Sequence, residues 1–68
     1  MSAKLEHLEK AVHDLAFARE SLIALYADAG PVERIVIHPL LVSTSKAWVD
    51  AAGLFEALNA LKAQEAGR

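Results

Sequence analysis

The 68-residue chain is 54% hydrophobic, contains no cysteine and carries a formal net charge of −2. This length predicts one domain over residues 1–68, and the lack of cysteine excludes disulfides and thiolate metal sites. The acidic net charge and the absence of clustered Lys or Arg argue against nucleic-acid binding. A domain of this size buries only about 60% of its unfolded surface, so we expect self-association to supply the missing burial.

The first segment, residues 3–29, is predicted to be a helix with one long apolar stripe. Its apolar side chains recur at the a and d positions of a heptad. Ser2 can cap its start, and Gly30-Pro31 is a stop signal, because Gly suits the position after a helix and Pro cannot continue one. The residues expected to form the interface with a second copy are Leu8, Val12, Leu15, Phe17, Arg19, Leu22 and Tyr26.

Two residues of this segment do not fit a simple apolar stripe. Arg19 occupies a core-type position, and its guanidinium can reach solvent or an acid such as Glu20 or Asp50. Alternatively, Arg19 fixes the register of a helix pair, as polar residues at a positions of coiled coils do. Phe17 falls at position f, opposite the stripe. It can be an exposed aromatic residue without a specific role, pack on a second copy or bind a foreign partner.

Residues 30–39 are predicted to be a break between two helices, framed by Gly30-Pro31 and His38-Pro39. The β-branched run at residues 35–37 leaves two forms open. One is a tight extended loop, and the other is a short strand that pairs with the same strand of a second copy.

The second helix is expected over residues 40–65. Trp48 and Phe55 are seven residues apart at the edge of its apolar stripe. Aromatic residues at helical spacing usually belong to a core, but Trp is also a frequent anchor at protein interfaces. The predicted fold is therefore all-α, a two-helix hairpin that homodimerises into a four-helix bundle.

The polar residues form no pattern typical of catalysis or metal binding. His7 and His13 are six residues apart and point to different sides of a helix, whereas helical metal pairs need a spacing of three or four. The run Ser43-Thr44-Ser45 has no base at a recognisable spacing and is expected to cap a helix. We therefore expect no enzyme activity, no metal and no cofactor. A signal peptide or membrane span is not expected either, which favours the cytoplasm.

The run from Lys46 to Leu54, followed by an Ala- and Leu-rich stretch to Gln64, resembles the second helix of a phage-encoded quorum-sensing anti-activator. The shared pattern is Trp, aliphatic, acid, small, Ala, any residue, Leu. The resemblance implies a homodimer from a Pseudomonas phage that binds the ligand-binding domain of a LuxR-type transcriptional regulator and keeps it from DNA. The resemblance also implies that Trp48 contacts the regulator. A Tyr with which the family inhibits a type IV pilus assembly ATPase maps onto Val42, which puts that second activity in doubt.

Three functions are open on these observations. The expected function is a non-enzymatic inhibitor that binds a host bacterial regulator through Trp48, Phe55 and Val42. One alternative is a helical-hairpin adaptor or co-chaperone that shields the amphipathic helix of a partner. Another is a self-associating structural protein without a foreign partner.

Overall fold

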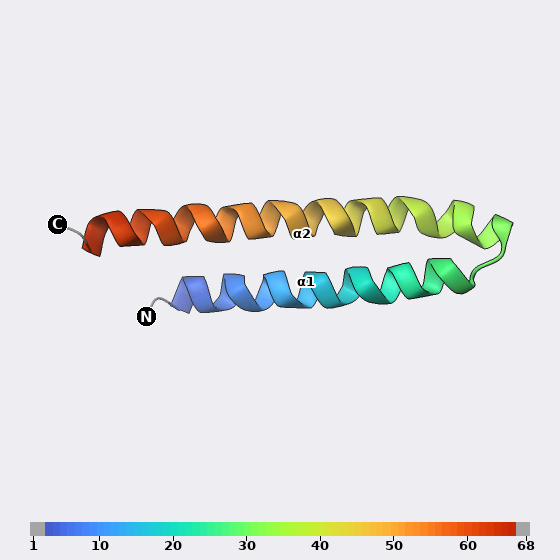
Figure 1. Ribbon diagram of the computed structural model, residues 1–68, viewed down its shortest axis with the longest axis horizontal. Coiled ribbons are helices and arrows are strands. Elements are labelled where there is room, and N and C mark those ends of the chain that lie inside the picture. The colour runs from blue at the N-terminus through green and yellow to red at the C-terminus, as the bar shows by residue number, and fades with distance from the viewer. Residues whose placement is uncertain (1–2, 67–68) are drawn as a thin grey trace.

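The computed structural model describes residues 3–66 and shows two helices packed as an antiparallel hairpin (Figure 1). Helix α1 spans Ala3–Asp28 and helix α2 spans Pro31–Ala66. The Cα atoms extend over 56 × 15 × 13 Å, and the end of α2 projects beyond the start of α1. The all-helical hairpin predicted from the sequence is confirmed. Ser2, the predicted cap of the first helix, lies outside the described residues.

The break predicted over residues 30–39 is wrong, because α2 already begins at Pro31. Only Ala29 and Gly30 connect the helices, and residues 35–37 are helical rather than loop or strand. Pro at the first helical position loses no intrahelical hydrogen bond, and its fixed φ suits a helix. The pair Gly30-Pro31 therefore ends one helix and starts the next.

The start of α2 is capped by its own first turn. The Gly30 carbonyl accepts a hydrogen bond from the Arg34 N–H at 3.0 Å, which is the first bond of the helix. The Glu33 carboxylate accepts one from the Gly30 N–H at 2.9 Å. This is the back-bond that a Glu at the third helical position makes in a capping box, so the local sequence favours a helix start here.

Pro39 lies inside α2, where the sequence predicted a helix boundary. A Pro within a helix cannot donate to the carbonyl four residues earlier and presses its ring against it, which costs about 3 kcal/mol or more. Ile37 and Leu41, on either side of Pro39, are both half-buried. Packing against α1 on both sides of Pro39 therefore outweighs its local preference.

The two helices meet along one seam with heptad spacing. Each helix contributes its a and d positions in alternating steps of three and four. None of the residues 3–66 is fully buried, because two helices cover only part of each other's stripe. The half-buried seam residues are Leu5, Leu8, Val12, Leu15, Arg19, Leu22 and Tyr26 of α1, and Ile37, Leu41, Thr44, Trp48, Ala51, Phe55 and Leu58 of α2.

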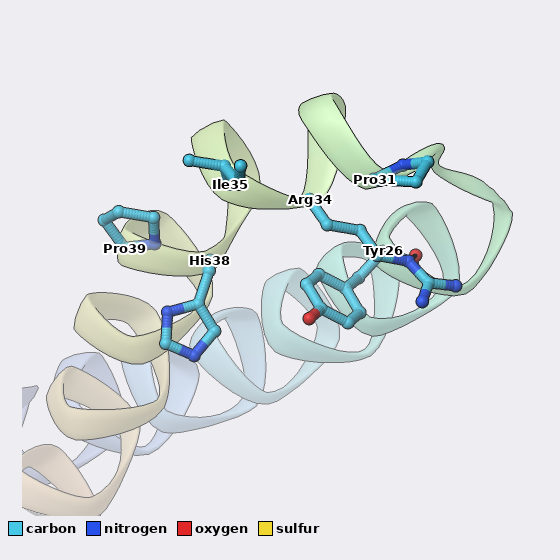
Figure 2. Close-up of a pocket in the computed structure, with 6 residues that line it drawn as sticks. All are labelled: Tyr26, Pro31, Arg34, Ile35, His38 and Pro39. Atoms are coloured by element: carbon cyan, nitrogen blue, oxygen red, sulfur yellow. Dashed lines mark hydrogen bonds between the residues drawn. The ribbon is translucent and has the colours of Figure 1, made fainter.

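Arg34 of α2 holds the turn closed by reaching to the end of α1 (Figure 2). Its Nε donates to the Tyr26 carbonyl at 3.0 Å and its Nη2 to the Ala27 carbonyl at 3.2 Å. Its guanidinium carbon also lies 5.0 Å from the centre of the Tyr26 ring. The last carbonyls of a helix lack intrahelical partners, and the helix dipole favours a cation there. Arg34 thus caps α1 from the neighbouring helix.

Candidate interaction surfaces

The residues predicted to contact a second copy lie, with one exception, in the seam. Six of them are half-buried between α1 and α2. The exception is Phe17, which is 76% exposed and stands away from α2. The first packing partner of this stripe is therefore the chain's own second helix, and contact with a second copy stays a prediction.

The three residues predicted to bind a foreign partner do not form one exposed cluster. Trp48 and Phe55 occupy successive a positions of α2 and are half-buried in the seam. Val42 is six residues before Trp48, or about 240° around the helix axis, and it is exposed. The two aromatic residues thus face α1, whereas Val42 faces outward.

A polar layer interrupts the seam at Arg19. Its Nε donates to Ser45 Oγ of α2 at 3.2 Å, and its guanidinium carbon lies 5.2 Å from the centre of the Trp48 ring. Its Nη1 is 3.5 Å from Glu20 Oε1. Of the two acids expected near Arg19, Glu20 pairs with it, whereas Asp50 pairs with Lys46 at 2.7 Å.

This polar layer restrains how the helices align. Among residues 3–66, the Arg19–Ser45 bond is the one hydrogen bond that joins a side chain of α1 to a side chain of α2. A shift of α2 by one heptad would replace Ser45 with His38 or Ala52 and remove the hydroxyl acceptor. The arrangement favours the interpretation of Arg19 as a register-setting residue. Ser45, predicted as a helix cap, serves here as the partner of Arg19, a role that local sequence patterns did not reveal.

A shallow hollow of about 520 Å³ opens beside the turn (Figure 2). The rings of Tyr26 and His38 lie across from each other there, with centroids 6.4 Å apart and planes inclined by 52°. Among residues 3–66, those that line the hollow include no acid, and the Arg34 guanidinium is bound to backbone carbonyls. The hollow is lined by Tyr26, Pro31, Arg34, Ile35, His38 and Pro39.

Two rows of apolar residues on α2 remain in contact with water. The leucine row consists of Leu40, Ala47, Leu54 and Leu61, and its three leucines are each between 51% and 56% exposed. The valine row consists of Ile35, Val42 and Val49, each more than half exposed. Members of a row are seven residues apart, nearly two turns, so each row follows one side of the helix. These rows are the candidate interaction surfaces, and among the three predicted partner-binding residues only Val42 belongs to one.

Neither described helix combines the length and apolar character needed to cross a membrane. Among residues 3–66, no group of three or more His, Asp or Glu side chains lies close enough together to hold a metal ion. Comparisons of the chain with family models, with curated proteins and with solved structures gave no match. Its function is therefore argued from its own surfaces.

Proposed function

We propose that this chain is a non-enzymatic protein-binding inhibitor that works as a homodimer. The observation that carries this proposal is the apolar surface that the hairpin leaves in water, above all the leucine row and the valine row. Monomeric proteins rarely expose contiguous apolar patches unless these patches bind another molecule. Two separate rows on one helix can serve two different protein contacts.

Homodimerisation into a four-helix bundle is supported by the surface area of the hairpin. The chain has a mass of 7.3 kDa and an accessible surface of 5255 Å². A compact monomer of that mass exposes about 4,200 Å², from the scaling of surface with mass. The excess of about 1,100 Å² exceeds the roughly 800 Å² that each partner buries in an interface of standard size.

The proposed target is the ligand-binding domain of a LuxR-type regulator in the cytoplasm of a bacterial host. This target class comes from the resemblance of residues 46–54 to a phage-encoded anti-activator. Val49 of the valine row lies within this segment, and Val42 lies one heptad before it on the same side of α2. Trp48 is adjacent to Val49 but half-buried, with Arg19 over its ring. We therefore place the centre of the contact on the valine row, with the exposed part of Trp48 beside it.

A second candidate function, an adaptor that shields a partner's helix, is favoured by the length of the valine row. The row from Ile35 to Val49 is about 21 Å long at 1.5 Å per residue. That length matches the apolar side of an amphipathic helix of about four turns, and helices commonly bind proteins through such a side.

The test uses the purified full chain and a panel of purified LuxR-type regulators from Pseudomonas. Calorimetry should detect binding to at least one ligand-binding domain, and a gel-shift assay should show release of that regulator from DNA. Val42→Glu should weaken binding at least tenfold, because it places a charge in the contact. Val36→Glu, at an exposed position outside both rows, is the matched control. No binding to any regulator would contradict the inhibitor proposal, and binding of an isolated helix alone would favour the adaptor.

A further inference from the structure

One side of the hairpin is apolar across both helices. In the antiparallel register, Arg19 lies next to Ser45 and Tyr26 next to His38, which places Leu25 beside Leu40. By the same register, Ala18 lies beside Ala47, one heptad further along. We call this side the leucine face: Leu25 and Ala18 of α1 with Leu40, Ala47, Leu54 and Leu61 of α2.

A hollow at the open end of the hairpin shows independently that these positions share one side. Lys4 and Leu61 both line it, together with the seam residues Leu5 and Leu58 and with Lys62 and Glu65 of the last turns of α2. Leu61 is the last member of the leucine row, and Ala18 and Leu25 follow Lys4 at multiples of seven residues. Each of these residues therefore continues the same side of its helix.

The leucine face has the pattern of a bundle interior. Its positions are the g positions of both heptads, immediately beside the a and d seam. Apolar residues at a and d alone are typical of a two-stranded coiled coil, whereas apolar residues at a, d and g are typical of a helix facing the interior of a larger bundle. The six positions of the face carry no charge. Charged side chains adjoin it at the open end of the hairpin, where Lys4, Lys62 and Glu65 line the hollow with Leu61.

The remaining sides of the hairpin are less suited to such a contact. The outer side of α1 carries Glu6, His13 and Glu20 in one row. The valine row belongs to α2 alone, and the neighbouring e positions of that helix include His38 and Ser45. The leucine face, by contrast, spans both helices and is uncharged at its six positions.

We propose that the leucine face is the surface on which a second copy of this chain packs, so that the two hairpins enclose one core. This rests on the proposed homodimer and assigns its interface to a face that the seam leaves open. A two-fold interface must be complementary to itself. In the α1 half of the face the side chain of Ala18 is small, and in the α2 half the side chains of Leu54 and Leu61 are large. Therefore α1 of one copy fits against α2 of the other. The excess surface of about 1,100 Å² per chain is sufficient for such an interface.

The assignment also separates the two contacts of the molecule. Around the axis of α2, the valine row lies about 140° from the leucine row. A second copy on the leucine face therefore leaves the valine row open to a foreign partner. Each contact can then be disrupted without the other.

The experiment measures the molar mass of the full chain by light scattering and its dimer dissociation constant by sedimentation. The wild-type chain should have twice the mass of 7.3 kDa. Leu54→Glu should weaken the dimer at least 100-fold, and the milder Leu54→Ala should weaken it about tenfold while keeping its helicity. Val49→Glu, a similarly exposed position on the valine row, is the control and should leave the dimer constant within twofold.

The possible failures are distinguishable. A wild-type monomer at 100 μM would overturn both the leucine-face interface and the proposed homodimer. A wild-type dimer that Leu54→Ala leaves unchanged, or that Val49→Glu dissociates, would overturn the face assignment alone. Circular dichroism of each variant separates loss of the dimer from loss of the helices.

Discussion

The guanidinium of Arg19 lies over the ring of Trp48, 5.2 Å from its centre, and links the two helices at the middle of the seam. Such a contact contributes roughly 0.5–1 kcal/mol at a partly exposed site. One face of the indole is therefore occupied within the chain. This relationship gives Trp48 a structural role beside any role in binding. Replacing Arg19 therefore tests directly what stabilises the seam and sets its register.

Replacing Arg19 with Leu should raise stability and lower specificity. Polar residues at a positions select register and oligomeric state at the expense of stability, and one more buried aliphatic side chain contributes about 1 kcal/mol or more. We expect a higher melting temperature together with a mixture of masses in light scattering. Arg19→Lys keeps the charge but loses the bond from Nε to Ser45, and serves as control. A single species with the wild-type mass from Arg19→Leu would show that Arg19 does not set the register.

Pro39→Ala should stabilise the chain, because α2 runs through this position. Removing a helix-interior Pro restores one hydrogen bond and relieves a clash, which we expect to raise the free energy of unfolding by about 1–3 kcal/mol. Urea unfolding followed by circular dichroism measures it. Pro31→Ala, at the first helical position, should be neutral or slightly destabilising. If residues 30–39 were a break after all, Pro39→Ala would leave the free energy of unfolding unchanged.

Arg34→Ala should loosen the turn, since it removes both side-chain hydrogen bonds to the last carbonyls of α1. We expect a loss of about 1–2 kcal/mol, because hydrogen bonds from charged groups contribute about 1.5–3 kcal/mol and this site is open to solvent. For a chain of this size the melting temperature should fall by roughly 4–8 °C per kcal/mol. Lys62→Ala, near the free end of α2, controls for loss of a positive charge. An equal melting temperature for both variants would show that Arg34 does not cap α1.

Two surface ion pairs should give the chain a small stability contribution that disappears in alkali. The hydrogen bonds that Lys10 and Lys46 donate to Asp14 and Asp50, and then the negative charges of these acids, raise the pKa of both lysines above the ordinary value of 10.5. A raised lysine pKa means that the folded state favours the protonated form. The ion pairs therefore contribute stability below the pKa of the unfolded chain, and this contribution is lost as the pH rises through the folded pKa.

The double variant Asp14→Asn with Asp50→Asn removes both ion pairs. Its melting temperature is compared with that of the wild-type chain between pH 7 and pH 12. The difference should shrink as the pH rises above 10.5, the ordinary lysine pKa. Salt should reduce it at pH 7, because exposed pairs are screened. A difference that stays constant across this range would contradict the assigned ion pairs.

The sequence predicted the hairpin because the heptad spacing of α1 is nearly uninterrupted from Leu5 to Tyr26. It misplaced the start of α2 because Pro39 signals a boundary locally, while packing of Ile37 and Leu41 on α1 overrides it. The pair Gly30-Pro31 by itself indicates the end of a helix, whereas Glu33, three residues after Gly30, is the signal of a capping box that starts the next helix.

The surfaces were harder to predict than the helices. The leucine row lies wholly within the helix predicted over residues 40–65, so its spacing of seven is visible in the sequence. The valine row includes Ile35 only because α2 starts at Pro31. The apolar pattern predicts Trp48 at the edge of the stripe, whereas the structure places it in the seam. The partners of Arg19 and Arg34 depend on how the two helices align, which no local pattern specifies.

The most direct test of the account is the melting temperature of the full chain at 5 μM and at 500 μM. A hairpin without a fully buried residue among those described should depend on a second copy for its stability, and a dimer is stabilised by mass action as its concentration rises. The account predicts a melting temperature that increases with concentration. A melting temperature that is the same at both concentrations, with the mass of one chain throughout, would contradict it.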